Sequence, residues 1–182
     1  MKLQKLLSYT RQAIEKYNMI QDGDKIAIGM SGGKDSLALL YAIAKLREFY
    51  PKSFDIIAIT IDVGLPGFDT SSMKALCDEL GVEYYVEKTD IYEIVFEARK
   101  EKNPCSLCTK LRKGALCDKI KSLGCNKLAY GHHKDDVTET FLMSLIYEGR
   151  INTFAPVTYL DRTDLYSIRP MIYVREGDIK GV

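Results

Sequence analysis

A glycine-rich loop at residues 31–36 constrains this sequence more than any other feature. The loop reads Ser-Gly-Gly-Lys-Asp-Ser and follows an apolar run at residues 25–30, which is typical of a buried strand. After it, Leu37, Leu40 and Ala44 recur on one face of a helix. A strand, a glycine loop and a helix in this order form a cradle whose backbone N–H groups bind phosphate. The pattern therefore predicts an α/β unit that binds a phosphorylated ligand.

The loop differs from the two best-known phosphate loops. Ile28 stands where a Walker A loop has its first glycine, and a dinucleotide fingerprint would need glycine in place of Ser31. Lys34 supplies a positive charge, and Ser31 and Ser36 supply hydroxyls. The carboxylate of Asp35, however, repels phosphate unless Mg²⁺ lies between them. The loop therefore favours a metal-bound pyrophosphate leaving group.

Strand-like and helix-like segments alternate along the whole chain. Apolar runs predict strands, and residues 157–160 and 165–168 are looser β-like pieces. Alternation of this kind predicts an α/β fold with a doubly wound parallel sheet, in one domain over residues 1–182 with an N-terminal helix within residues 1–20. The other expected strands are 54–61, 82–86 and 127–130, and the other expected helices are 71–80, 91–100, 107–123 and 135–147.

The amino-acid composition limits the class of protein and its expected cellular location. The sequence is 46% hydrophobic and 28% charged, with a net charge of +1, as in an ordinary globular protein. No apolar run has the length of about 20 residues that a membrane span needs, so we expect a cytoplasmic protein without a membrane partner. An acidic excess at residues 51–98 is followed by a basic excess at residues 99–127. The basic segment is either a solvated helix face or a footprint for phosphate groups.

Two of the five cysteines form a close pair, Cys105 and Cys108, before a helix that carries Lys110 and Arg112. A helix N-terminus and nearby cations lower the pKa of a thiol and favour the thiolate that binds metal or attacks sulfur. The pair alone is a weak signal. A zinc site needs two further spaced ligands, and a redox disulfide belongs at the first helix of a thioredoxin-type pattern.

The segment Gly-His-His-Lys-Asp-Asp at residues 131–136 contains both histidines of the chain. It follows a predicted strand and begins a helix, so it lies at the carboxyl edge of the sheet, where ligands bind. Asp135 has an alternative structural role as the N-cap of that helix. Two imidazoles beside two carboxylates at this edge favour a ligand-binding role.

The loop resembles the PP-loop of the ATP pyrophosphatases, which cleave ATP between the α- and β-phosphates and adenylate a substrate. The resemblance implies an adenine nucleotide α-hydrolase-like fold. It also implies that the end of the second strand, around Ile61 and Val63, holds adenine through backbone groups. A buried strand end without a ligand remains an equal alternative there.

The combination of motifs resembles the tRNA 2-thiocytidine synthetase family over nearly the whole chain. It joins the loop, the cysteine pair, the segment at 131–136, residues 168–170 and Arg175-Glu176. The resemblance implies a [4Fe-4S] cluster on Cys105, Cys108 and a third cysteine beyond Arg175, so we expect a C-terminally truncated chain. Cys117 and Cys125 are alternative third ligands, although Cys117, like Cys77, fits a helix core.

The same resemblance assigns roles. Asp35 and Asp136 hold Mg²⁺, His132 orients phosphate or substrate, and the partners are tRNA, a sulfur donor such as a cysteine desulfurase and a second copy in a homodimer. The expected catalytic residues are Lys34, Asp35, Cys105, Cys108, His132 and Asp136. The expected ATP-binding residues are Ser31, Gly32, Gly33, Lys34, Asp35, Ser36, Ile61, Val63, Arg112, Gly131 and Asp136.

The implied reaction adenylates a cytidine in a tRNA anticodon loop and replaces its oxygen with sulfur. Three alternatives stay open at this point: a lysidine-synthetase-like enzyme, which needs no cysteine pair, a uridine-thiolating enzyme, and a non-catalytic ATP sensor. Pyrophosphate release in the presence of tRNA distinguishes the enzymes from the sensor.

Overall fold

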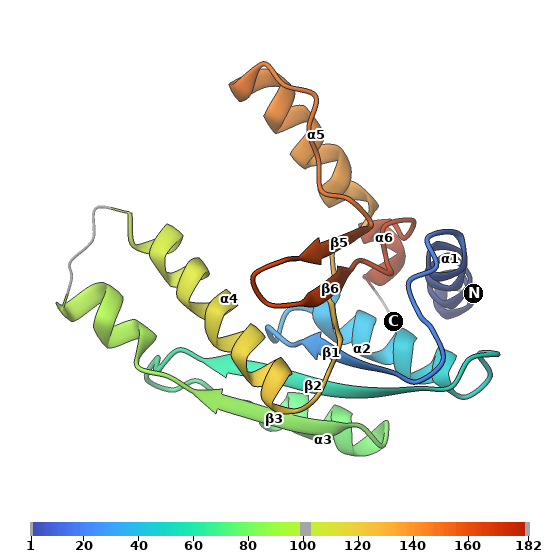
Figure 1. Ribbon diagram of the computed structural model, residues 1–182, viewed down its shortest axis with the longest axis horizontal. Helices are drawn as coiled ribbons and strands as arrows, with labels where there is room; N and C mark the ends of the chain where they lie inside the picture. Colours follow the sequence, from blue (N-terminus) through green and yellow to red (C-terminus); the bar gives the residue numbers. More distant parts are fainter. Residues whose placement is uncertain (1, 99–102, 181–182) are drawn as a thin grey trace.

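One six-stranded sheet organises the chain, in the strand order β3-β2-β1-β4-β6-β5 (Figure 1). The computed structural model describes residues 2–98 and 103–180. Neighbouring strands are parallel except for the last pair. The strands are β1 (Asp24–Gly29), β2 (Phe54–Asp62), β3 (Glu83–Lys88), β4 (Lys127–Ala129), β5 (Val157–Leu160) and β6 (Leu165–Ile168). The predicted α/β sheet is therefore confirmed for its parallel part.

The edge strand β5, one of the two looser β-like pieces of the sequence, pairs with β6 in antiparallel orientation. The connection between them is a short turn that includes Asp164 at φ 51°. A parallel pair needs a crossover of a dozen or more residues. So short a connection therefore dictates a hairpin.

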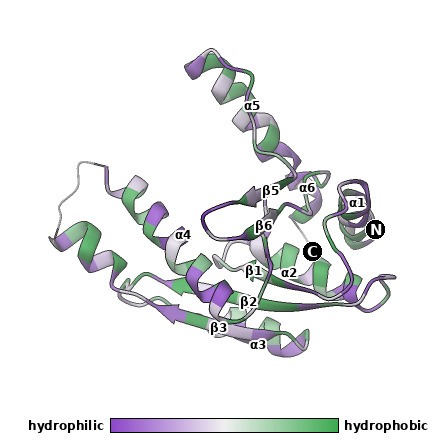
Figure 2. Ribbon diagram, in the orientation of Figure 1, coloured by the Kyte–Doolittle hydropathy of each residue, from purple (hydrophilic) through white to green (hydrophobic). Residues whose placement is uncertain are grey.

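Two apolar cores cover the two faces of the sheet. One contains Leu39, Leu40 and Ile43 of α2 (Lys34–Arg47), together with residues of α1 (Lys2–Lys16) and α3 (Ser71–Glu79). Figure 2 shows the hydrophobic colouring of α2. The other core joins Ile59 of β2 and Ile120 of α4 (Pro104–Ser122). Burial on both faces explains why β1 and β2 read as continuous apolar runs rather than alternating ones.

A buried ion pair ties the first strand to the fourth. The Lys127 ammonium lies 2.6 Å from the Asp24 carboxylate and donates to the carbonyl of Met19 at 2.8 Å. Asp24 also accepts hydrogen bonds from the Gln21 N–H and the Asn126 amide. Both ionic side chains are almost fully buried. Every buried polar group of this pair is satisfied, which is the condition for burying charge at all.

The helix α5 (Lys134–Glu148) projects away from the body of the domain (Figure 1). It ends at Gly149, whose φ of 63° reverses the chain. Its far half exposes large apolar side chains, among them Ile146 at 71% and Tyr147 at 81%, and Ile151 follows at 82%.

Two predicted helices differ in detail. α4 begins at Pro104 rather than at residue 107, so the cysteine pair lies inside its first turns. Proline at the first helical position is a start signal, because its missing N–H would be unpaired there anyway. The helix predicted at 91–100 contains the π-helical segment η1 (Glu93–Ala98), and its last two residues lie outside the described residues. Within the described ranges, no helix has both the length and the apolar character to cross a membrane.

Candidate nucleotide and thiolation site

The glycine loop turns sharply between β1 and α2. Gly32 adopts φ 77°, a left-handed conformation that glycine takes without steric cost. The Ser36 hydroxyl donates to the carbonyl of Gly33 at 2.8 Å, and the Gly33 N–H donates to the Ser31 hydroxyl at 3.3 Å. These bonds fold the loop over the N-terminus of α2, which is the cradle that the sequence predicted.

A cavity of about 490 Å³ opens above this loop, within the range of small-molecule sites. Its walls come from the loop, the end of β2, one side of α4 and the connection from β4 to α5. The predicted site residues that line it are Ser31, Asp35, Ser36, Ile61, Arg112, Gly131, His132 and Asp136. Thr109, Lys113 and Tyr130 join them.

Several predicted residues lie outside that lining. Val63 follows the end of β2, and its carbonyl already accepts a hydrogen bond from the Tyr92 N–H at 2.8 Å. Gly32 and Gly33 shape the loop without lining the cavity. Lys34 and the two cysteines also lie beyond its walls. Their assigned roles stay predictions.

Gly131 is required by close packing at the edge of the sheet. A Cβ atom there would lie 2.9 Å from the carbonyl oxygen of Asp35 and 3.2 Å from the backbone nitrogen of Ser36. The absence of a side chain lets the β4–α5 connection rest directly on the first turn of α2. Both halves of the cavity are thereby fixed to each other.

His133 links the carboxylates that the sequence singled out. Its side chain is 7% exposed; Nδ1 lies 3.4 Å from Asp136 and 3.7 Å from Asp135, and Nε2 lies 3.8 Å from Asp35. Nδ1 accepts from the Asp136 N–H at 3.4 Å, so Nε2 is the ring nitrogen that faces Asp35. His133 is also the N-cap of α5 and closes a capping box with Asp136, so the alternative N-cap role of Asp135 is wrong.

The paired carboxylates fit a hard cation. The Oδ1 atom of Asp35 is buried without a hydrogen-bond partner in the described chain, and Asp136 lines the same cavity. Carboxylate oxygens are the ligands that Mg²⁺ prefers, alongside waters and substrate phosphates. No group of three or more His, Cys, Asp or Glu residues arranged as a metal site occurs in residues 2–98 and 103–180. Two protein carboxylates plus phosphate oxygens match the usual mode of Mg²⁺ binding.

His132 lies in an aromatic and cationic wall. Its ring stacks on Phe154 at 4.8 Å and packs against Tyr130 at 5.6 Å, and the Arg169 guanidinium covers Phe154 at 4.9 Å. Burial, with the charge of Arg169, lowers the pKa of His132. Burial also raises the pKa of Tyr130 to about 12. Since Nδ1 of His132 is buried and unpaired among the described residues, the neutral ring keeps a lone polar atom beside the cavity.

Lys34 is held by a carboxylate that the sequence reading did not assign. Its ammonium lies 3.0 Å from Glu176 and 3.3 Å from Asp35. The ion pair with Glu176 raises the pKa of Lys34 and lowers that of Glu176. Glu176 begins the short helix α6 (Glu176–Ile179), and its N–H donates to Asp135 at 2.7 Å. The C-terminal part of the domain thus reaches the loop.

The cysteine pair lies one turn away from the cavity wall. Cys105 is exposed and Cys108 half-buried, and Thr109, next to Cys108, lines the cavity. All five cysteines are free thiols. Two thiols three residues apart on one helix turn fit two ligand positions of an iron–sulfur cluster. The alternatives Cys117 and Cys125 do not fit a third, because both are buried in the core and burial raises the pKa of each thiol.

Residues 4–181 match the family model of the PP-loop domain. The chain is 44% identical over 180 residues to the tRNA-cytidine(32) 2-sulfurtransferase of Aliivibrio salmonicida, covering 98% of this chain and 59% of that protein. It is 39% identical over 176 residues to the protein of the same name from Geobacter sulfurreducens, covering 96% and 68%. The chain therefore spans about three fifths of the length of the first of these relatives.

A solved structure agrees with this assignment. The U34-tRNA thiolase NcsA from Methanococcus maripaludis, with its [4Fe-4S] cluster, superposes with a TM-score of 0.76 at 25% identity, covering 98% of this chain and 61% of that one. An NH3-dependent NAD synthetase from Campylobacter jejuni, at 18% identity and a TM-score of 0.56, shares the fold. The chain belongs to the PP-loop family, in its tRNA 2-thiocytidine synthetase branch.

Proposed function

We propose that the protein is an ATP-dependent tRNA sulfurtransferase that adenylates a cytidine of the anticodon loop and replaces its O2 atom with sulfur. The observation that supports this most is the shared edge of the sheet. One cavity is walled by the PP-loop, the 131–136 segment and the side of α4 next to the cysteine pair. A nucleotide and a thiol-bearing helix turn therefore adjoin the same space. Relatives named for this reaction support the choice of base.

ATP binding involves the loop first. The N–H groups at the start of α2 and the hydroxyls of Ser31 and Ser36 receive the phosphates, as in other helix N-terminal anion sites. Asp35 and Asp136 hold Mg²⁺ against the phosphate oxygens. The Lys34 ammonium leaves its ion pair with Glu176 and binds the departing pyrophosphate. Together with the metal it stabilises the negative charge of that leaving group.

The chemistry then proceeds in two displacements. The cytidine O2 atom attacks the α-phosphorus, and the bond from that phosphorus to the bridging oxygen breaks to release pyrophosphate. Hydrosulfide next attacks C2 of the adenylated base, the C2–O bond breaks to release AMP, and the S–H proton is lost as the C2=S bond forms. A [4Fe-4S] cluster held by Cys105, Cys108 and a further thiolate would bind and deliver this hydrosulfide. A cysteine desulfurase or a similar donor, with a two-electron reductant for its persulfide sulfur, would replenish it. His132, neutral and unpaired at Nδ1, orients the base or the α-phosphate.

Mass analysis of tRNA nucleosides tests the proposal. The protein, reconstituted anaerobically with iron and sulfide, is incubated with ATP, Mg²⁺ and unmodified tRNA. We expect a thiolated cytidine with wild-type protein. Asp35→Asn is expected to abolish adenylation, whereas Cys105→Ala should retain ATP binding and lose thiolation. A product free of thiolated cytidine contradicts the proposal, as does full adenylation by Asp35→Asn.

The uridine-thiolating alternative has one specific observation in its favour, since the superposed solved structure is a U34-tRNA thiolase. The same nucleoside analysis separates the two, because thiolated uridine and thiolated cytidine differ in mass. Lysine attached to cytidine identifies a lysidine-forming reaction. ATP binding without pyrophosphate release identifies a sensor.

We further propose that two cytoplasmic copies of the chain associate through the far half of α5. Met143, Ile146 and Tyr147 are exposed there, and Ile151, just after the helix, is exposed as well. A helix that is apolar around its circumference is normally buried. The same tip carries Glu148 and Arg150, whose opposite charges can pair across a two-fold axis.

A further inference from the structure

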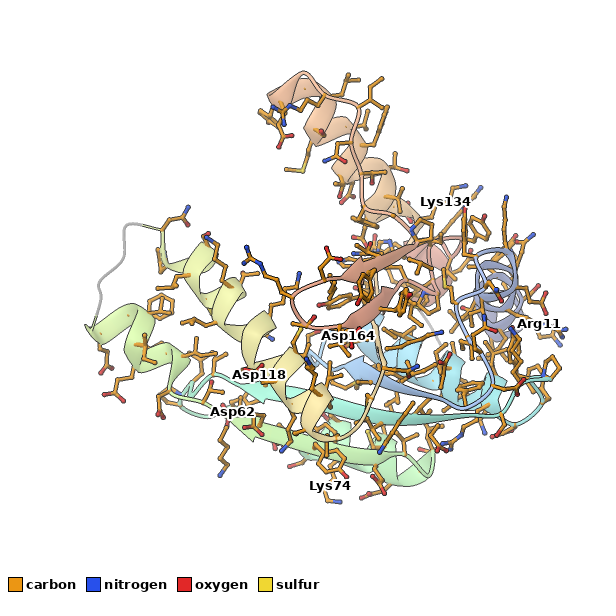
Figure 3. All side chains as sticks on the ribbon, in the orientation of Figure 1. Arg11, Asp62, Lys74, Asp118, Lys134 and Asp164 are labelled. Carbon is orange, nitrogen blue, oxygen red and sulfur yellow. The ribbon has the colours of Figure 1, made fainter. Side chains whose placement is uncertain are left out.

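A second cavity, of about 290 Å³, lies on the other side of the foot of α5. Figure 3 shows Lys134 at this foot, between α5 and α1, with Arg11 farther along α1. The walls of the cavity combine two tyrosine rings with the amide of Gln12 and three cationic side chains. Its lining is Tyr9, Gln12, Lys16, Lys134, Tyr173 and Arg175, here called the α1–α5 pocket.

Three cations meet in the α1–α5 pocket without a counter-charge. Among the described residues, neither Lys16 nor Lys134 nor Arg175 lies within 4.0 Å of a carboxylate oxygen. Like charges brought together cost free energy unless an anion joins them. The arrangement of donors therefore indicates an anion site.

Nearby carboxylates are already engaged elsewhere. Glu176 lies between Lys34 and Lys180, at 3.0 Å and 3.1 Å. Asp178 faces Lys5 at 4.0 Å, and Asp135 accepts the Glu176 N–H. None of them lies within 4.0 Å of Lys16, Lys134 or Arg175, so these three cations have no ion-pair partner among the described residues.

The pocket is held in shape by its tyrosines. The Tyr173 hydroxyl donates to the Tyr17 hydroxyl at 3.0 Å, and the two rings lie 6.0 Å apart. The Lys16 ammonium lies 6.0 Å from both ring centres, a cation–π arrangement. The Lys134 N–H donates to the Val174 carbonyl at 2.8 Å, which ties the foot of α5 to the segment before Arg175. The Lys16 ammonium and the backbone that carries Lys134 and Arg175 are therefore positioned before a ligand arrives.

The pocket adjoins the nucleotide cavity without being part of it. His132 and Asp136 line the first cavity, whereas Lys134, between them in sequence, lines the second. The first turn of α5 thus separates an ATP site from a cationic site. A polymer crossing this turn contacts both.

We propose that the α1–α5 pocket binds adjacent phosphates of the tRNA backbone and so anchors the strand whose base enters the nucleotide cavity. This inference rests on the proposed function. Ammonium, guanidinium, amide and phenol groups all donate to phosphodiester oxygens, and phosphate contacts fix register while base contacts choose sequence.

Equilibrium binding of tRNA at several salt concentrations tests the assignment. In the triple variant Lys16→Gln, Lys134→Gln, Arg175→Gln, we expect tRNA to bind at least about tenfold more weakly, and the slope of log affinity against log salt to fall by about 2. That slope follows from about 0.7 counterions released per single-strand phosphate contact. ATP affinity and the melting temperature should stay at wild-type values. A matched control is Arg11→Gln, Lys45→Gln, Lys74→Gln, which removes the same charge from cations already paired on the surface.

Each result decides the matter. Unchanged tRNA affinity and slope in the first variant, or an equal loss in the control, overturns the inference. Inorganic pyrophosphate and anionic lipid vesicles are titrated in parallel. If the triple variant loses binding of pyrophosphate or of vesicles while its tRNA binding stays at the wild-type level, the pocket binds a free anion or a membrane surface, and the inference is overturned. If wild-type protein thiolates no tRNA, the proposed function is wrong. If wild-type protein thiolates tRNA and the triple variant binds tRNA as tightly as wild type, only the assignment of the α1–α5 pocket is wrong.

Discussion

At the scale of single residues, Gly131 sets the geometry of the site. Replacing Gly131 with Ala places a Cβ 2.9 Å from the Asp35 carbonyl oxygen, and backbone cannot yield as a flexible side chain does. Overpacking of this kind costs about 1–3 kcal/mol. We expect Gly131→Ala to lower the free energy of unfolding by that amount and to weaken ATP binding. Urea unfolding and ATP titration measure the two effects.

Gly114 provides the matched control. It lies inside α4, and a Cβ there meets no atom within 4 Å. Alanine in an exposed helix interior is more stable than glycine by about 0.5–1 kcal/mol. Gly114→Ala should therefore stabilise the protein, and similar effects of both substitutions would contradict the packing argument.

The buried His132 predicts a pH dependence of stability. Burial lowers its pKa below the ordinary value of 6.5, so the unfolded chain takes up a proton before the folded chain does. Stability therefore falls as pH falls below about 6.5, and the residue contributes no change above that value. His132→Phe, which keeps a ring beside Phe154, should lessen the loss of stability between neutral and mildly acidic pH. Urea unfolding at several pH values measures the free energy of unfolding of wild type and of His132→Phe. An equal loss in both proteins between neutral and mildly acidic pH would refute this prediction.

The positions of site residues were predictable from the sequence only where the residues belong to a motif with a known backbone geometry. Ser31, Asp35, Ser36 and Asp136 line the expected cavity because strand–loop–helix geometry places them at the carboxyl edge of the sheet. The sequence analysis gave a role to His132 and none to His133, because the contacts of His133 with three carboxylates depend on the β4–α5 connection. The contacts of Arg169 and Glu176 follow from how distant segments close around the sheet, which local patterns do not report.

At the scale of elements, the strands were the most predictable feature, because burial on both faces makes them uniformly apolar. The start of α4 was placed too late by three residues, although Pro104 is a typical first helical residue. The orientation of β5 was missed because apolar pattern alone does not tell antiparallel from parallel neighbours.

The ion pair between β1 and β4 predicts a large element-level effect. Lys127→Met leaves the Asp24 carboxylate buried without its cation, and breaking a buried pair in this way costs about 3–5 kcal/mol. We expect urea unfolding to show this loss, and the double variant Asp24→Asn, Lys127→Met to recover most of it. Lys74→Met, at an exposed pair with Asp78, should change stability by less than about 1 kcal/mol. A small effect at Lys127 would show that the pair does not hold the strands.

At the scale of the whole molecule, the projecting α5 predicts self-association. Ile146→Lys places a charge in the middle of the apolar tip, so it should shift the protein from dimer to monomer. Sedimentation velocity over a range of concentrations measures this. Phe49→Lys, at an exposed apolar residue away from α5, is the control. Wild-type protein that stays monomeric at every concentration contradicts the proposed interface.

The contact between Lys34 and Glu176 has a consequence for biosynthesis. Most of the chain's length separates the two residues, yet one neutralises the other in the finished domain. A ribosome adds about 5–20 residues per second, so the loop emerges on the order of ten seconds before its counter-charge. During much of that interval β1 also lacks its neighbour β4, which ends at Ala129. The ion pair of the nucleotide site therefore forms only after residues 1–176 have been synthesised.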